Sequence, residues 1–196
     1  MSKTGVIAID LGGVLLRDGT VAAQSACEAL GIPPDVYRQR WHDMRPFVDT
    51  GQLYGSSLWR SLALPYADPD AVETAVLDAF TELNYGVISL REYARCHRLI
   101  LATNHVTDWI EIWKARFPWF SLFSGIFNSA DVGVRKPDLA FFMQLRGRFS
   151  PSVMIDDHPA NLTAAAQAGM QTVLATGMWY NAVLDALEHT ERKQSA

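Results

Sequence analysis

Short apolar runs that end on polar or small residues are the feature that most constrains the fold of this chain. Four clear runs and one weaker run have this character: residues 6–10 (VIAID), 98–104 (RLILATN), 152–157 (SVMIDD), 171–176 (QTVLAT) and, more weakly, 124–129 (SGIFNS). Runs that are apolar throughout, without alternation, are typical of parallel strands that are covered on both faces. The runs therefore predict a buried parallel sheet.

Helix-length amphipathic segments separate the later runs, at residues 107–117, 138–148 and 160–168. The last of them begins next to Pro159 and stops at Gly169, which is a typical start and stop for a helix. Strands that alternate with helices in this way predict an α/β fold with a doubly wound, Rossmann-like parallel sheet.

Residues 20–85 break this alternation. They contain helix-like patterns with Gly and Pro between them, and no strand-like run interrupts them. We expect a small helical domain over residues 17–86, inserted between two parts of a core domain, residues 1–16 and 87–196.

Composition narrows the class of protein. The chain has 196 residues, 49% hydrophobic and 19% charged, which is enough to bury a sizeable core. Its net charge of −4, without a basic run, argues against a nucleic-acid or membrane partner. Cys27 and Cys96 match no metal or redox spacing, and neither a signal peptide nor a membrane-spanning run is apparent. These features lead us to expect a cytoplasmic location.

Polar residues gather where the expected strands end, and parallel strands place these ends at one edge of the sheet. An ammonium group lies in the loop before the strand at 152–157. The residues concerned are Asp10, Thr103, Asn104, Lys136, Asp156 and Asp157. Carboxylates are the ligands that Mg²⁺ prefers, whereas a hydroxyl and a lysine suit phosphoryl oxygens. An aspartate can also act as the nucleophile in phosphoryl transfer.

Each of these residues taken alone also has a purely structural explanation. Asp10 could cap a turn, Thr103 and Asn104 are common turn formers, and Lys136 precedes a proline in a loop. Asp156 and Asp157 could cap the following helix. The occurrence of all of them in this order favours the functional interpretation.

The order resembles the four motifs of the haloacid dehalogenase superfamily: DLGGVL (10–15), LATN (101–104), RKPD (135–138) and MIDDHPANLTAAAQAGM (154–170). The resemblance implies an Mg²⁺-dependent hydrolase of small phosphomonoesters that works through an aspartyl-phosphate. Asp10 would be the nucleophile, Thr103 would bind the phosphoryl group and Lys136 would neutralise charge. Mg²⁺ would be held by Asp10, Asp156, Asp157 and the backbone of Gly12.

Residues 48–62 (VDTGQLYGSSLWRSL) also resemble the helical cap of the sugar-phosphate-phosphatase-like branch of this superfamily. We therefore expect the helical domain to close over a small phosphate ester. Substrate contacts are expected from residues beside the motifs and in the cap, namely Gly12, Gly13, Asn104, Arg17 and Arg45. Trp41, Tyr54 and Trp59 are further candidates for the cap lining, although aromatics at helical spacing more often belong to a core.

Gly12 departs from the family pattern. Most phosphatases of the superfamily carry an aspartate at this position, which protonates the leaving group and then activates water. Glycine keeps the backbone carbonyl for the metal but lacks that acid–base group. His105, Asp18 and His158 are near enough in sequence to the expected site to be candidate substitutes.

Two other functions stay open at this point. A 2-haloacid dehalogenase would use Asp10 without a metal, but the extra carboxylates of Asp156 and Asp157 would repel a carboxylate substrate. A degenerate, non-catalytic binding protein would explain Gly12 but not the other intact motifs. The oligomeric state is also open, and a homodimer is compatible with the sequence.

Overall fold

Five parallel strands form the centre of the molecule, in the order β3-β2-β1-β4-β5. The coordinates are a computed structural model, and they describe residues 5–17, 19–177, 179, 181–183 and 185–187. The strands are β1 (Val6–Ile9), β2 (Arg98–Thr103), β3 (Phe123–Asn128), β4 (Val153–Asp156) and β5 (Gln171–Leu174). All five sequence-predicted strands are present, and β1, the first strand in sequence, lies in the middle.

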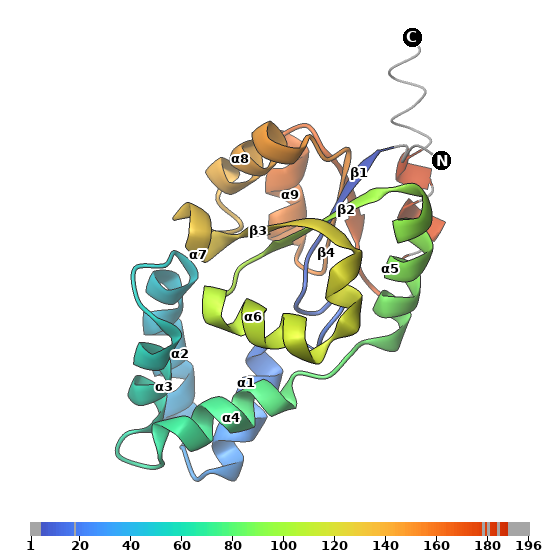
Figure 1. Cartoon of the computed structure of the whole chain (residues 1–196). Coiled ribbons are helices and arrows are strands. Elements are labelled where there is room, and N and C mark those ends of the chain that lie inside the picture. The colour runs from blue at the N-terminus through green and yellow to red at the C-terminus, as the bar shows by residue number, and fades with distance from the viewer. Residues whose placement is uncertain (1–4, 18, 178, 180, 184, 188–196) are drawn as a thin grey trace.

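Helices cover both faces of this sheet (Figure 1). The core helices are α5 (Asn84–Cys96), α6 (Thr107–Arg116), α7 (Ser129–Val132), α8 (Leu139–Phe149) and α9 (Pro159–Gln167), together with the 3₁₀-helix η1 (Pro118–Leu122). The predicted helices at 107–117, 138–148 and 160–168 correspond to α6, α8 and α9. The fold is therefore the doubly wound α/β fold that the sequence predicts.

Alternate residues of the central strand contact different helical layers. Ala8 belongs to an apolar cluster with residues of α8 and α9, whereas Ile7 and Ile9 belong to a cluster with residues of α5 and α6. All three side chains are fully buried. Burial on both faces explains why the strands are apolar throughout and do not alternate.

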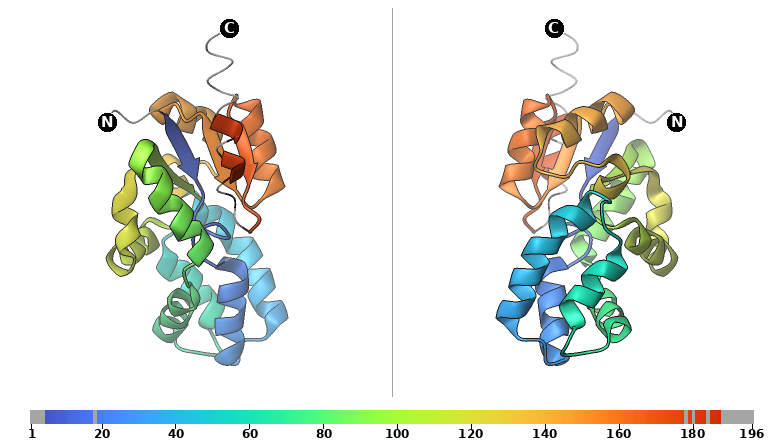
Figure 2. Two further views of the ribbon diagram at one scale, coloured as in Figure 1. Left: turned by 90° about the vertical axis from the view of Figure 1, so that its right-hand side faces the viewer. Right: turned by 90° about the vertical axis from the view of Figure 1, so that its left-hand side faces the viewer.

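The remaining helices lie between β1 and β2 in the chain and form a separate group below the sheet in Figures 1 and 2. They are α1 (Gly19–Ala29), α2 (Pro34–Asp49), α3 (Gly55–Ala63) and α4 (Pro69–Ala79). α1 packs on α2 and α4, and α3 packs on α2 and α4. We call these four helices the helical group.

Two chain segments connect the helical group to the sheet, and they lie side by side. Arg17 N donates to Thr81 O at 2.9 Å, and Leu83 N donates to Leu15 O at 2.8 Å. The expected domain boundary after residue 86 falls inside the first turn of α5. The segment that joins α4 to α5 directly precedes that helix.

An aromatic contact also joins the helical group to the core. Trp59 of α3 stacks on Trp109 of α6, with ring centroids 4.7 Å apart and an interplanar angle of 15°. Both side chains are buried, and the apolar cluster on the α5–α6 side of the sheet continues through them into the helical group. Among the described residues, no helix combines the length and apolar character needed to cross a bilayer.

Candidate active site

The carboxyl ends of neighbouring strands bring the motif residues together. Asp10 directly follows β1, Thr103 ends β2 and Asp156 ends β4. The strand register places these ends level with each other, because Ile9 lies opposite Leu101 on one side and Ile155 on the other. All three polar side chains are at least nine-tenths buried. This edge is where open parallel sheets bind ligands.

Lys136 connects two of these carboxylates. Its Nζ lies 2.9 Å from Asp10 Oδ1 and 2.6 Å from Asp156 Oδ2, and the residue is only 2% exposed. The Asn104 side chain holds the lysine backbone in place: Nδ2 donates to Lys136 O, and Oδ1 accepts from Lys136 N, each at 2.9 Å. The lysine of the loop before α8 is therefore a fixed part of the sheet edge.

Three carboxylates converge beside this lysine. One oxygen from each of Asp10, Asp156 and Asp157 lies within 4.8 Å of the others. Asp156 Oδ1 accepts from the His158 backbone and from Asn161 Nδ2, at 2.9 and 2.8 Å. Asp157 Oδ1 is buried and has no hydrogen-bond partner among the described residues. An unpartnered carboxylate oxygen within an all-oxygen donor set fits a hard cation such as Mg²⁺.

The pKa values of the clustered groups also indicate that the site favours additional positive charge. Burial raises the pKa of Asp10 from 3.8 to about 7, even though Lys136 acts in the opposite direction. Burial also raises the pKa of Asp157. Burial alone would lower the pKa of Lys136, but the carboxylates of Asp10 and Asp156 outweigh it and raise that pKa. One ammonium group does not neutralise three clustered carboxylates.

The two glycines after Asp10 differ in their surroundings. Gly13 has φ +71°, and a Cβ there would lie 2.0 Å from Asp157 Oδ2, so no other residue fits without a shift. Gly12 is not among the glycines with positive φ, and a Cβ there would meet nothing within 4 Å. The close approach of backbone to carboxylate explains Gly13, whereas nothing in the backbone requires a glycine at position 12.

A cavity of about 560 Å³ lies over this edge, between the sheet and α2. Its walls come from the strand ends, the start of α1, α2, the loop before α8 and the start of α9. The lining residues are Asp10, Gly12, Thr20, Trp41, His42, Arg45, Pro46, Asp49, Thr103, Asn104, His105, Arg135, Lys136, Pro137, Asp157, His158, Pro159, Ala160 and Asn161. The helical group and the core thus enclose one shared space.

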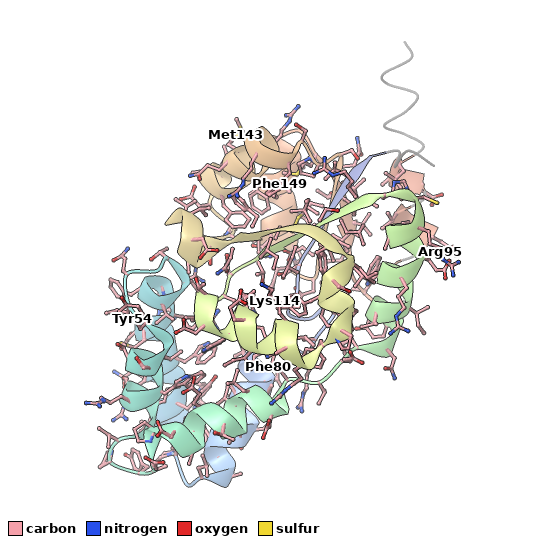
Figure 3. All side chains as sticks on the ribbon, viewed as in Figure 1. Tyr54, Phe80, Arg95, Lys114, Met143 and Phe149 are labelled. Carbon is pink, nitrogen blue, oxygen red and sulfur yellow. The ribbon has the colours of Figure 1, made fainter. Side chains whose placement is uncertain are left out.

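The sequence-predicted cap residues divide into two sets. Trp41 and Arg45 line the cavity. Arg17 is exposed and Trp59 is buried against Trp109, and neither lines it. Tyr54 is 77% exposed at the outer edge of the helical group (Figure 3). Asn104 lines the cavity, although both polar atoms of its side chain are hydrogen-bonded to the Lys136 backbone.

The residues expected as substitutes for an acid–base group at position 12 are placed very differently. His105 is buried beside the cavity, and its ring packs against Trp109 and Trp113. Burial, followed by the nearby charges of Arg45 and Lys136, lowers its pKa well below 6.5. It is therefore neutral at pH 7 and a poor proton donor. His158 is exposed, with Nε2 3.9 Å from Asp157 Oδ2, and Asp18 lies outside the described residues.

Three residues of the site were missed by the sequence interpretation. Asn161 supports Asp156, and Asp49 and Arg135 form a charged group on the opposite wall with Arg45. Asn161 lies within the fourth motif and could have been noticed as an amide five residues after Asp156. Nothing in the sequence spacing links Asp49 to Arg135, because they meet only when α2 packs against the loop before α8.

Comparison with known proteins gives consistent structural likenesses and little sequence similarity. No family profile matches the chain. A segment that covers 28% of the chain is similar to the drimenol cyclase drtB of Aspergillus calidoustus, with 44% identity over 59 residues. The match covers 11% of that protein, so the chain corresponds to only a small part of this curated relative.

Several solved structures share the whole architecture. The HAD family enzyme BT-2542 of Bacteroides thetaiotaomicron, in complex with magnesium and inorganic phosphate, superposes with a TM-score of 0.74 at 16% identity, covering 90% of this chain and 96% of that one. A predicted HAD-like hydrolase of Porphyromonas gingivalis gives a TM-score of 0.73 at 20% identity, covering 95% and 98%.

The L-2-haloacid dehalogenase of Xanthobacter autotrophicus, with chloropropionic acid covalently bound, gives a TM-score of 0.65 at 15% identity and covers 89% of this chain and 77% of that one. Phosphate-binding and dehalogenating proteins are thus both represented among these neighbours. Identities of this size establish the architecture but not the reaction. The chain has the fold of the haloacid dehalogenase (HAD) superfamily.

Proposed function

We propose that the protein is a Mg²⁺-dependent hydrolase of small phosphomonoesters that works through an aspartyl-phosphate on Asp10. The observation that carries this proposal is the convergence of Asp10, Asp156 and Asp157 beside the buried Lys136. Mg²⁺ held by the three carboxylates and the backbone of Gly12 would supply positive charge to the phosphoryl oxygens. BT-2542, which shares the fold, was crystallised with magnesium and phosphate.

Asp10 would attack the phosphorus atom. Its Oδ1 accepts from Leu11 N at 2.7 Å and pairs with Lys136 Nζ at 2.9 Å, so this oxygen is fixed and Oδ2 is available for attack. The P–O bond of the ester breaks as the Asp10–phosphorus bond forms. Thr103, at the end of β2, would donate its hydroxyl to a phosphoryl oxygen, and Lys136 would offset the repulsion between the carboxylate and the phosphoryl group.

A water molecule would then attack the phosphorus atom of the aspartyl-phosphate, releasing phosphate and the Asp10 carboxylate. Gly12 has no side chain to protonate the departing alcohol or to deprotonate this water. The proton for the alcohol would come from solvent in the cavity. The consequence is a preference for esters whose leaving groups need no proton.

The helical group would act as a cap over this edge. α2 forms one wall of the cavity and contributes Trp41 and Arg45, and the core domain supplies the catalytic residues. Closure of such a cap limits exchange with bulk solvent and selects among substrates. Arg45 is the residue of the group best placed to bind an anionic oxygen.

The test is hydrolysis of p-nitrophenyl phosphate and a panel of sugar phosphates, with Mg²⁺ and with EDTA. We expect turnover that depends on Mg²⁺ and disappears in Asp10→Asn, a nearly isosteric change that removes the nucleophile. Asp131→Asn is the matched control, because this exposed carboxylate accepts from the Thr107 hydroxyl at 2.6 Å and makes no other hydrogen bond to the residues that the structure describes. Near-normal turnover in Asp10→Asn would contradict covalent catalysis.

Halide release from a 2-haloacid and ligand binding, measured beside this assay, separate the two alternatives. A 2-haloacid dehalogenase would release halide in EDTA, but two extra carboxylates beside Asp10 would repel a carboxylate substrate. A non-catalytic binding protein would turn over nothing while binding a ligand. Gly12 favours the second alternative, and the buried contacts of Lys136 with both carboxylates favour catalysis.

A further inference from the structure

A buried carboxylate at the end of α2 joins the helical group to the catalytic edge. Asp49 is fully buried. Its Oδ1 accepts from Arg45 Nε at 2.9 Å and lies 2.7 Å from Arg45 Nη2. Its Oδ2 lies 3.4 Å from Nη2 of Arg135, the residue directly before Lys136. One carboxylate therefore lies between a guanidinium of the helical group and one of the core.

The same arginine reaches a second core loop. Arg45 Nη2 donates to Asn104 O at 3.3 Å, and its guanidinium lies 4.5 Å from the centre of the Trp41 ring. The Asn104 side chain in turn holds both backbone polar groups of Lys136. Because Arg135 directly precedes Lys136 in the chain, these contacts close a ring. We call it the Asp49 ring, and its members are Asp49, Arg45, Asn104, Lys136 and Arg135.

We infer that Asp49 is a positioning residue, which holds Arg45 against the phosphoryl-binding edge and ties α2 to the loop that carries Lys136. The inference rests on the proposed phosphatase function and adds to it a residue that touches no reacting atom. Two guanidiniums share one carboxylate, so the ring keeps an excess of positive charge in the cavity wall. That excess suits an anionic substrate group.

Stability alone is a weak explanation for this arrangement. Taking a carboxylate fully out of water is costly, and a buried ion pair often stabilises a fold no more than apolar residues of the same size. The helical group and the core are already joined by the Trp59–Trp109 stack. A second ion pair, Arg116 with Asp78 at 2.7 Å, joins them at the surface, with Asp78 62% exposed. The Asp49 ring differs from that pair in its burial and in its contact with both catalytic loops.

The first experiment measures kcat and KM for p-nitrophenyl phosphate in Asp49→Asn, with Asp78→Asn as the matched control. Asparagine keeps the shape but loses the charge that orients Arg45. We expect KM to rise about tenfold with kcat within about twofold of wild type, because binding is lost equally in the ground and transition states. Asp78→Asn should change neither constant. A defect of folding alone would lower the active fraction, and hence kcat, without changing KM.

The second experiment asks whether Asp49 acts through Arg45. In an Arg45→Gln background, Asp49→Asn should raise KM by less than about twofold more, since the arginine that Asp49 holds against the phosphoryl-binding edge is gone. Full multiplication of the two effects would overturn the inference. Arg135→Gln disrupts the ring at a different residue. This side chain is 36% exposed, so its replacement is less of a risk to folding. It should raise KM in the same direction.

A third measurement does not depend on activity. The Lys136 amide is bonded to Asn104 Oδ1, so its hydrogen exchange reports on the ring. Exchange at Lys136 should be faster in Asp49→Asn than in wild type or Asp78→Asn, with core-strand amides unchanged, because the Asn104–Lys136 bond opens more often although the bonded state, and with it kcat, is retained. Unchanged exchange at Lys136 would overturn the inference even if the wild type is an active phosphatase. Absence of all Mg²⁺-dependent turnover in the wild type would instead overturn the proposed function, while faster exchange would still support the ring.

Discussion

At the scale of single residues, the absence of a carboxylate at position 12 leads to a specific prediction about substrate preference. Gly12 has no positive φ, and its added Cβ would meet no atom within 4 Å. Gly12→Asp should therefore fold and raise kcat for alkyl phosphates by about a hundredfold, with a much smaller gain on p-nitrophenyl phosphate. Comparison of the two substrate classes in steady-state assays measures this selectivity.

Gly12→Ala and Gly13→Ala are the controls for that variant. The first should behave like the wild type, whereas the second should lose Mg²⁺-dependent activity, because its Cβ would collide with Asp157 Oδ2 and its backbone has φ +71°. If the wild type already hydrolyses alkyl phosphates as fast as the aryl ester, a substitute acid exists. His105→Ala, Asp18→Ala and His158→Ala would then show which residue it is.

Lys136 should contribute strongly to catalysis, since it lies between two carboxylates in a buried position. Lys136→Met removes the charge while keeping most of the side-chain volume. Turnover should fall by about two to three orders of magnitude, corresponding to about 3–4 kcal/mol of lost electrostatic stabilisation. Lys114→Met is the control, because that lysine pairs on the surface with Glu111, one turn away on the same helix. A loss smaller than about threefold would contradict the assigned role.

At the scale of elements, the loop before α8 depends on the loop after β2. Asn104 fixes Lys136 through one donated and one accepted hydrogen bond, each at 2.9 Å. Asn104→Asp can still accept from Lys136 N but would place an oxygen against Lys136 O. Asn104→Ala makes neither bond. We expect kcat to fall about tenfold or more in both variants, with Mg²⁺ affinity measured by calorimetry little changed.

An equal loss of Mg²⁺ binding would contradict this interpretation, because it would place the effect on the carboxylates and not on the lysine loop. Asn161→Ala is the informative contrast. Asn161 bonds Asp156 Oδ1 at 2.8 Å, so its removal should weaken Mg²⁺ binding instead. The two asparagines thus support different halves of the same site.

At the scale of the whole molecule, the carboxylate cluster should make the metal-free protein less stable as the pH rises. Asp10 has a pKa of about 7 in the folded chain against 3.8 unfolded, so the folded state binds more protons between these values. The stabilisation is fully present below pH 3.8 and is lost as the pH rises through 7. In EDTA, Tm should fall by about 5 °C between pH 5 and pH 8 through this contribution.

Asp10→Asn should flatten this dependence, since the amide does not titrate. Saturating Mg²⁺ should reverse the pH dependence, so that Tm rises with pH, because the ion binds the ionised carboxylates of the folded state only. Thermal unfolding followed by circular dichroism at several pH values tests both expectations. The same pH dependence of Tm in the wild type and in Asp10→Asn would show that Asp10 titrates normally, since the contribution of the buried His105, which has the opposite sign, is present in both proteins.

Much of the architecture was determined by local sequence. Strands that are buried on both faces must be apolar throughout, and helices must have an apolar face, so the order of elements follows from side-chain periodicity. The positions of Asp10, Thr103 and Asp156 at strand ends follow from the same pattern, because parallel strands align their carboxyl ends. This is why the five strands and the convergence of these residues were predictable.

Only the tertiary structure decided which distant residues meet. Asp49 and Arg135 are remote in sequence and form a pair through the packing of α2 on the loop before α8. Two candidates for the cap lining lie elsewhere: Tyr54 is exposed, and Trp59 is buried in an aromatic stack, as aromatics at helical spacing more often are. Periodicity shows which face of a helix is apolar, but not which neighbouring element covers it. That choice depends on the shapes and charges of both surfaces, which a linear pattern does not contain.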